Sequence, residues 1–367
     1  MQRFSAMAHC VVFLLLGAGL PGVPAAAQTG TFLDKLRPTD VRVVAYNLGG
    51  FNDGFSDQPF NFTGGQWRFD DTYARVIDAL DADVWAFQEI AQRSSSDIRS
   101  AMNLADPLPN GESWQVYRSS NQVIASRYAF SDTGASVGGS PRRPTIATID
   151  LPDTMSQRDL HLVNVHLKAG GGSDDETRRI DAIDRIQQYF REAQQPGDVD
   201  ELEPATPTVF LGDFNTASGL DPVLNLLFGN ITNEAVYGSD QALDWDGTSL
   251  GAIQPTHNND PTGVNWTFRS SSGFTNRLDY QLFTDSTASL AQSFILNTQL
   301  MSSAERSASG LMPNDVLYNA NTGFWDHLPV VADYSFRTLI IPEPASGVCL
   351  LAVVAGIGWH RRRTIPG

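Results

Sequence analysis

The stretch from Thr208 to Thr216 constrains the fold of this chain more than any other. Its first half, up to Leu211, is apolar or β-branched, which suits a strand buried on both faces, and its second half turns polar. Asp213 and Asn215 therefore stand where such a strand leaves the core. Because side chains alternate along an extended chain, this acid and this amide project to the same side and can meet one phosphate or metal-bound water. Taken alone, the pattern is more typical of an Asx-type turn that closes a strand.

Short apolar runs rich in β-type residues recur along the body of the chain. Between them, Asp70–Leu80 and Thr177–Phe190 carry apolar residues at helical spacing. The segments Gly49–Phe69 and 216–261 are predicted as loops from their composition. Many strands and few helices predict two packed sheets covered by helices, in one domain over residues 41–337. The predicted strands are Val41–Tyr46, Asp83–Ile90, Gln122–Ala129, Thr145–Leu151, Asp159–Leu167, Trp266–Phe268, Arg277–Phe283 and Leu328–Tyr334.

Both ends of the chain have the composition of targeting segments. Arg3, the apolar run Val11–Leu16 and the small residues before Gln28 predict a secretory signal peptide over residues 1–27. Residues 28–40 are predicted as a linker. Residues 338–367 hold a Pro-Glu-Pro sequence, an apolar stretch and three arginines, so a buried helix and a short membrane anchor are both open. We therefore expect an exported protein, extracellular or at the cell surface, with a tail that can anchor it transiently in a membrane.

The charge and cysteine content limit what the domain can bind. Without the two ends, which hold four arginines and one glutamate, the formal net charge of −16 becomes about −19. Such a surface repels polyanions at long range, so a substrate that carries phosphate must be attracted by a local cationic site or a metal ion. Cys10 and Cys349 both lie in the end segments, so the domain is expected to rely on its core and not on a disulfide.

Polar residues suited to metal-assisted phosphate chemistry recur at the ends of the predicted strands. A single polar residue at a strand end means little, but the ends of stacked strands converge on one rim of a molecule. Residues far apart in sequence can therefore line one cleft. These residues are Asn47, Glu89, His166, Asp213 with Asn215, Asp326 with His327, and Asp279 early in its strand.

The order of these motifs resembles the endonuclease/exonuclease/phosphatase superfamily, which includes DNase I and neutral sphingomyelinases. Their joint occurrence, with Gly212-Asp213-Phe214-Asn215 and Arg277-Leu278-Asp279-Tyr280 among them, spans nearly the whole body of the chain. The resemblance implies a four-layered α/β/β/α sandwich and Mg²⁺-dependent hydrolysis of phosphate esters, with Mn²⁺ or Ca²⁺ as other candidate ions. The C-terminal tail is similar to a PEP-CTERM sorting signal, which implies processing by an exosortase-type system.

Three residues are the predicted metal ligands. A hard divalent cation prefers carboxylate oxygens, and Mg²⁺ takes one or two of them from protein, so Glu89 is the first candidate. Asn47 would supply a neutral oxygen and Asp326 a second acidic contact. The ion would neutralise charge that grows on the phosphate in the transition state.

The other motif residues are assigned to catalysis. His327 is the predicted general base for the attacking water, because its unperturbed pKa lies near working pH, and the resemblance makes Asp279 its orienting partner. Asp213 competes for the role of base. Asn215 would hold the phosphate by its amide, and His166 would bind a phosphoryl oxygen or protonate the leaving group.

Several other polar residues can have structural or surface roles only. His161 and Asp333 are predicted to be structural, and Asp279 has the alternative of a surface acid paired with Arg277. His257 is expected to face solvent, and Lys168 is expected to be a solvated loop residue. Local anion contacts and plain surface charge both fit Arg142-Arg143 and Arg178-Arg179.

We expect a monomer that acts on nucleic acid. The aromatic segment Phe51–Phe69 can stack bases or touch lipid, although packing of a long loop is the commoner use. A sphingomyelinase-like activity would require an apolar wedge near the cleft, and the sequence between Phe283 and Phe324 shows no compact hydrophobic hairpin. A sugar or inositol phosphatase and a non-catalytic surface binding module are the remaining alternatives.

Overall fold

The computed structural model describes residues 31–49, 59–90, 93–135, 137, 142–270, 272–316 and 326–336. The predicted signal peptide and C-terminal tail lie outside these ranges, as do residues 50–58, which include part of the aromatic segment. Within the described ranges, no helix has the length and apolarity needed to cross a bilayer. Part of the predicted linker is described and packs on the domain: Leu33 is buried, and Lys35 Nζ lies 2.5 Å from Asp83 Oδ2.

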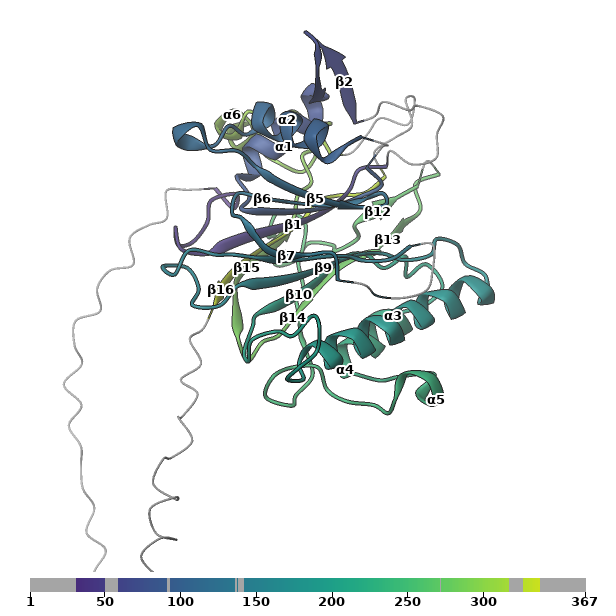
Figure 1. Cartoon of the computed structure of the whole chain (residues 1–367). Helices are drawn as coiled ribbons and strands as arrows, with labels where there is room; N and C mark the ends of the chain where they lie inside the picture. The colour runs from purple at the N-terminus through teal and green to yellow at the C-terminus, as the bar shows by residue number, and fades with distance from the viewer. Residues whose placement is uncertain are drawn as a thin grey trace, which may run out of the picture. The chain divides into compact units, whose positions relative to one another are not determined.

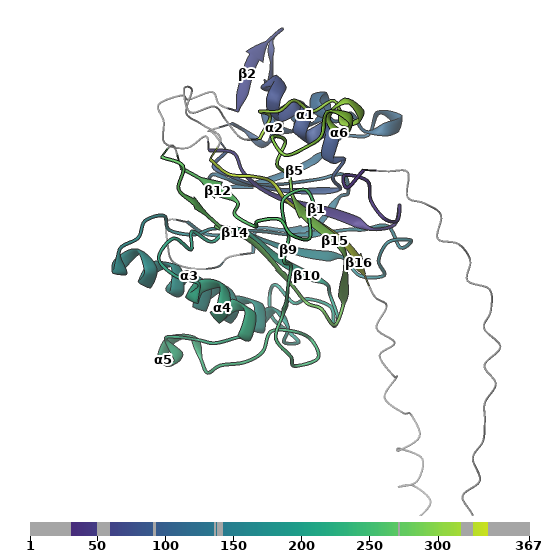
Figure 2. The same cartoon turned by 180° about the vertical axis from the view of Figure 1, so that it is seen from behind.

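Two six-stranded mixed sheets form the centre of the domain. Figures 1 and 2 show them stacked, with α1, α2 and α6 over the outer face of the first sheet and α3, α4 and α5 over that of the second. This arrangement confirms the predicted α/β/β/α sandwich. The first sheet has the order β15 (Ala288–Ile295), β16 (Val330–Phe336), β1 (Val41–Asn47), β4 (Val84–Gln88), β6 (Gln122–Ser126), β5 (Gln115–Ser119). The second has the order β11 (Gly251–Ala252), β14 (Asp279–Phe283), β10 (Thr208–Asp213), β9 (Leu160–His166), β8 (Thr145–Ile149), β7 (Phe130–Thr133).

The helices and two small hairpins complete the described elements. Asp70 caps α1 by accepting a hydrogen bond from the backbone N–H of Thr72, as its position before the apolar pattern indicates. The helices are α1 (Asp71–Leu80), α2 (Ser95–Ala105), α3 (Ser173–Ala193), α4 (Asp221–Phe228), α5 (Glu234–Tyr237) and α6 (Ser303–Ser309), with a 3₁₀ turn at Pro109–Gly111. The hairpins pair β2 (Phe60–Thr63) with β3 (Gln66–Phe69), and β12 (Phe268–Arg269) with β13 (Thr275–Asn276).

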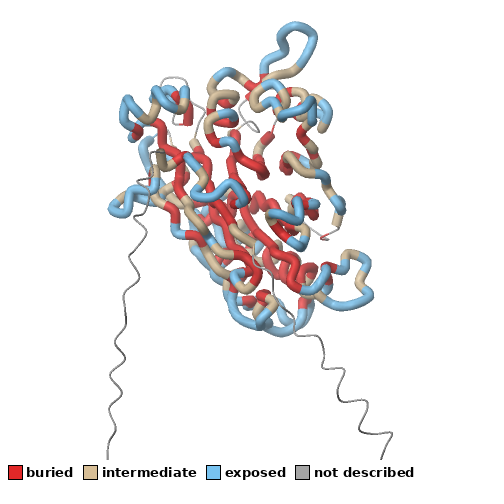
Figure 3. Tube along the Cα trace, turned by 90° about the vertical axis from the view of Figure 1, so that its left-hand side faces the viewer, coloured by how far each residue is buried: buried red, intermediate tan, exposed pale blue. Residues whose placement is uncertain are grey.

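The period of two along β10 divides its side chains between two apolar cores. Val209 and Leu211 belong to the core between the sheets, whereas Phe210 belongs to the core under α3, where its ring centroid lies 5.1 Å from that of Phe190. Figure 3 shows these central strands as buried. Burial on both faces explains the near-continuous apolar sequence before Asp213.

Strand direction gathers the predicted site residues at one edge of the stacked sheets. β1 runs parallel to β4, and β9 runs parallel to β10, so these four strands end at the same edge. β14 and β16 run antiparallel to their neighbours β10 and β1, so they begin there. The pairs at this edge are Asn47 with Gln88, His166 with Asp213, and Asp213 with Asp279.

The two segments predicted as loops contain regular elements. Phe60–Phe69 forms the β2–β3 hairpin, with Gly64 and Gly65 both at positive φ, as a tight two-residue hairpin turn requires. The segment 216–261 contains α4, α5 and β11. The loop prediction was wrong for Phe60–Phe69, because glycine and asparagine content masked its short apolar pattern. Residues 216–261 are mostly loop, as predicted, around these three short elements.

Candidate active site

The side-chain oxygen Oδ2 of Asp213 lies at the centre of the predicted residues. It accepts hydrogen bonds from Asn47 Nδ2 and Asn215 Nδ2, each at 3.0 Å. His166 Nε2 lies 3.7 Å from it and His327 Nε2 3.9 Å. Because β1 belongs to one sheet and β10 to the other, the Asn47 bond joins the two sheets at the rim.

His327 and Asp279 form a buried pair on one side of Asp213. His327 Nδ1 lies 2.7 Å from Asp279 Oδ2, and the Phe268 ring lies with its centroid 5.2 Å from that of the imidazole. Burial alone would lower the pKa of His327, but the carboxylates of Asp279 and Asp213 outweigh it and raise that pKa well above its usual value. Asp279 is thus buried beside a histidine, and it is not a surface acid paired with Arg277.

His166 lies on the other side of Asp213 among groups of both charges. Its Nε2 is 3.3 Å from Glu89 Oε1 and 2.8 Å from Nη1 of Arg142, which also donates to the Leu167 carbonyl. Burial would raise the pKa of Glu89, but the hydrogen bond and charge of His166 lower it to about 2. Arg142 therefore lies in the site beside His166, and its use as a local anion contact stays a prediction.

Several donor atoms at the rim could hold a hard cation. Single ligand atoms of Glu89, His166 and Asp213 lie within 4.8 Å of one another. Burial raises the pKa of Asp213 to about 6, and burial with the nearby Glu89 charge raises that of Asp326. Buried carboxylates with raised pKa values lack compensating positive charge. A divalent cation would supply that charge. Of the two predicted acidic ligands, Glu89 belongs to this group of three and Asp326 does not, so the predicted ligand set stays a prediction.

The backbone adopts special conformations next to these side chains. Glu89 and Asn215 have φ values of 54° and 50°, in the left-handed region that ordinary residues seldom adopt. Such strain is concentrated at functional sites. Gly212 has a φ of 127°, and a Cβ there would lie 2.1 Å from the Val165 carbonyl oxygen, so only glycine fits between the strands that position Asp213 and His166.

Other predicted residues lie apart from this centre. Buried His257, expected in solvent, is held by the Trp266 carbonyl at 2.8 Å and by Asn297 at 3.1 Å. That prediction was wrong because a turn that looks polar is folded against β15. Arg179 is also buried: it donates to the carbonyls of Lys168 and Gly170 and steadies the loop after His166.

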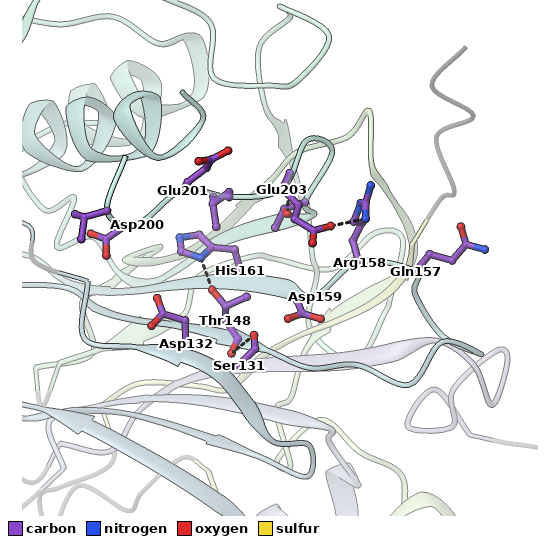
Figure 4. A pocket seen from close by; sticks show the side chains of 13 residues that line it. Ser131, Asp132, Thr148, Gln157, Arg158, Asp159, His161, Asp200, Glu201 and Glu203 are labelled. Carbon is purple, nitrogen blue, oxygen red and sulfur yellow. Dashed lines mark hydrogen bonds and ion pairs between the residues drawn. The ribbon is translucent and has the colours of Figure 1, made fainter. Parts of the chain in front are cut away.

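A hollow among the described residues lies at the opposite end of β9 from His166. It is a cavity of about 400 Å³ around His161, lined by carboxylates that include Asp132 and Asp200 (Figure 4). His161 Nδ1 lies 3.0 Å from Thr148 Oγ1, so the ring has a structural partner, as expected. The predicted catalytic residues do not line this cavity.

A family model for the endonuclease/exonuclease/phosphatase family matches residues 44–300, more than half of the chain. The chain belongs to this family. Its members are metal-dependent phosphoric ester hydrolases, so the chain is an enzyme of that class. The matched segment includes Asn47, Glu89, His166, Asp213 and Asp279, and the resemblance inferred from the motifs is confirmed.

The chain is similar to several solved structures. ANGEL2, a 2′,3′-cyclic phosphatase in complex with adenosine-2′,3′-vanadate, is 15% identical with a TM-score of 0.50, covering 83% of this chain and 98% of its own. TDP2 from D. rerio, complexed with a single-strand DNA product, is 13% identical with a TM-score of 0.48, over 81% and 99%. A family protein from Beutenbergia cavernae DSM 12333 is 15% identical with a TM-score of 0.44, over 81% and 72%. No curated protein matches the chain in sequence.

Two polar residues of the site were not predicted. Asn121 Nδ2 lies 3.4 Å from His166 Nδ1, and the Thr267 hydroxyl lies 2.6 Å from Asp279 Oδ2. Asn121 immediately precedes a predicted strand, which is the signal that marked the other residues. Thr267 lies inside a predicted strand, so nothing in its sequence position distinguishes it from a structural threonine.

Proposed function

We propose that this enzyme is an exported, Mg²⁺-dependent phosphodiesterase that hydrolyses nucleic acid. The observation that carries the proposal is the convergence on Asp213 Oδ2 of the Asp279–His327 pair and the Glu89–His166 pair. These residues combine a base, its orienting acid, a metal ligand and a phosphate contact within one buried rim.

The residues of the rim have distinct proposed roles. Glu89, with Asn47 and Asp326, would hold Mg²⁺, which supplies positive charge to a phosphate oxygen when bound. In its neutral form, His327 takes the proton of the attacking water at Nε2, while Asp279 holds Nδ1. Because the pKa of His327 is raised, this neutral form is favoured by higher pH. Asp213 is the weaker candidate for base, because its oxygens already accept three N–H groups from Asn47 and Asn215.

Phosphate contacts are assigned to the residues around the leaving group. His166 and Arg142 lie 2.8 Å apart and present an imidazole and a guanidinium to the same place. An arginine matches phosphate oxygens well, so this pair would hold a phosphoryl oxygen within a protein whose net charge repels polyanions. Both Nδ2 hydrogens of Asn215 bond to protein, to Asp213 and Leu167, so its proposed contribution is to set Asp213 in place beside the phosphate.

The aromatic hairpin supports nucleic acid as the substrate class. Phe62 on β2 is 59% exposed, and its ring centroid lies 5.1 Å from that of Trp67 on β3. The guanidinium carbon of Arg93 lies 3.5 Å from the Trp67 ring centroid. An exposed aromatic ring beside a guanidinium suits base stacking and phosphate attraction together.

A substrate panel tests this proposal. Purified protein with Mg²⁺, Mn²⁺ or Ca²⁺ is expected to cleave DNA or RNA, and a chelator is expected to stop the cleavage. Glu89→Gln and His327→Ala are expected to abolish it, whereas Glu203→Gln, which changes an exposed partner of Arg158, is the matched control. Intact nucleic acid together with release of phosphocholine from sphingomyelin, or of phosphate from sugar phosphates, would refute the nuclease assignment. Absence of all turnover and of Mg²⁺ binding would support a binding module.

The destination of the protein is proposed from its ends alone. We propose cleavage before Gln28, export, and processing of the 338–367 tail by an exosortase-type system, which leaves a monomeric domain outside the cell. Sequencing of the mature N-terminus, mass measurement of the C-terminus and light scattering of the purified protein test these three points. A cell-associated, full-length chain would contradict them.

A further inference from the structure

The hydroxyl group of Thr267, just before β12, makes three hydrogen bonds to the residues around Asp279. Its oxygen accepts from the backbone N–H groups of Leu278 and Asp279, each at 3.0 Å. The same hydroxyl donates to Asp279 Oδ2 at 2.6 Å. Thr267 has no exposed surface, so water does not compete for these bonds.

The direction of the third bond follows from the first two. A hydroxyl group has two lone pairs and one proton, and backbone N–H groups can only donate. Leu278 and Asp279 therefore occupy both lone pairs, and the proton is directed to Asp279 Oδ2. That oxygen is the one that lies 2.7 Å from His327 Nδ1, so Thr267 and His327 share a single acceptor atom.

The backbone of Thr267 also holds the segment that carries His327. The Thr267 carbonyl accepts from the Leu328 N–H at 2.7 Å, and the Arg269 N–H donates to the Asp326 carbonyl at 2.7 Å. Together these bonds form an antiparallel bridge between Phe268 and His327. One short strand thus contacts both the acid and the histidine, which come from different parts of the chain.

We propose that Thr267 is a positioning residue that fixes the Asp279 carboxylate and, through it, the ring orientation of His327. The proposal rests on the role of base given to His327 above. With Asp279 Oδ2 fixed between the two donors, the His327 ring is held with Nδ1 toward the carboxylate and Nε2 toward Asp213. A base held in this way needs no reorientation before it accepts a proton.

Three substitutions test the hydroxyl group. Thr267→Val keeps the shape of the side chain and removes its hydrogen bonds, whereas Thr267→Ser keeps the hydroxyl. Thr208→Val is the matched control, because Thr208 is a buried threonine at the other end of β10 whose hydroxyl bonds to the Thr206 carbonyl. If the Thr267→Val protein does not fold, Thr267→Ala is a second variant that lacks the hydroxyl group.

The readouts are steady-state kinetics and proton NMR of the imidazole N–H groups. Thr267→Val is expected to lower kcat on the cleaved substrate about tenfold to a hundredfold with KM nearly unchanged, because a displaced base affects the chemical step more than binding. Thr267→Ser is expected to restore kcat to within about threefold, and Thr208→Val to leave it unchanged. The downfield Nδ1–H resonance of His327 is assigned by its loss in His327→Gln. We expect this resonance in the wild type and in Thr267→Ser. In Thr267→Val we expect it to disappear or to move upfield.

Each outcome bears on the proposal separately from the proposed function. Unchanged kcat and an unchanged resonance in folded Thr267→Val or Thr267→Ala would overturn it. A lower melting temperature with no change in either readout would also overturn it, since that is the result for a merely structural threonine. A wild-type protein that cleaves nothing would refute the proposed function, while the resonance would still show whether Thr267 orients His327.

Discussion

Two histidines on β9 lie five residues apart and have opposite surroundings. Both are buried: His161 is 2% exposed and His166 1%. His161 contacts hydroxyl groups and the ring of Phe190, whose plane lies within 18° of its own. His166 contacts Arg142, Glu89 and Asp213. The direct contacts of His161 are thus neutral groups, whereas those of His166 are charged.

The comparison shows that two equally buried histidines can have very different electrostatic surroundings. Carboxylates line the cavity beside His161, yet burial is the cause that lowers the pKa of His161, to about 3 (Figure 4). At the other end, His166 helps to lower the pKa of Glu89 to about 2 against the effect of burial. Direct contact between charged groups, and not their number nearby, distinguishes the His166 end from the His161 end.

The largest expected effect comes from replacing each histidine with an amide. We expect His166→Gln to lower kcat about 10²- to 10³-fold, because the phosphate contact and proton donor are lost, and His161→Gln to leave kcat within about threefold. Initial rates at saturating substrate and Mg²⁺, with circular dichroism to confirm folding, make the comparison. Equal losses in the two variants would remove the functional distinction between the ends of β9.

A smaller effect is expected from acid on the His161 end. The pKa of His161 in the fold, about 3, lies below the ordinary 6.5, so its stabilising contribution is complete above pH 6.5 and is lost as pH falls toward 3. The unfolded chain takes up a proton in that window and the folded chain does not. The difference in proton uptake lowers the unfolding free energy by about 1.4 kcal/mol per pH unit, or by about 2–3 kcal/mol between pH 6.5 and 4.5.

His161→Phe keeps an aromatic ring beside Phe190 and removes the titration. Urea unfolding at pH 6.5 and 4.5 is therefore expected to show a smaller loss of unfolding free energy in the variant than in the wild type. Thr148→Val, which removes the hydroxyl at Nδ1 and keeps the histidine, is the control and should retain most of the loss. If His161→Phe lost as much stability as the wild type, His161 would have to be protonated in the fold.

The sequence predicted the residues that meet at the His166 end of β9 better than the structures around them. Apolar runs and the polar residues that follow them located Asn47, Glu89, His166 and Asp213, because strand ends depend on local patterns. The β2–β3 hairpin, α4 and α5 were not predicted, since their apolar patterns are short and lie between turn residues. Local pattern carries little information where an element is only four to eight residues long.

Contacts across the sheets explain what the sequence did not indicate. Thr267 precedes Asp279 by 12 residues, and Arg142 precedes His166 by 24, so their roles depend on how separate strands meet. His257 was misplaced for the same reason, because its partner Asn297 lies 40 residues away. The motifs specified which residues gather at the rim, and packing determined which others support them.

The smallest expected effect concerns Lys168, two residues beyond His166. Its ammonium lies 2.9 Å from the Asp175 carboxylate, and both side chains are partly exposed. An exposed ion pair contributes little to stability, so Lys168→Met should leave the urea midpoint of unfolding nearly unchanged and change kcat/KM by less than about threefold. The measurements are urea unfolding and kcat/KM at low and high salt. Any difference between the variant and the wild type that comes from charge should disappear at high salt, because salt screens the ion pair. A tenfold loss of kcat/KM would instead extend the charged end of β9 past the strand and into the loop that Arg179 holds.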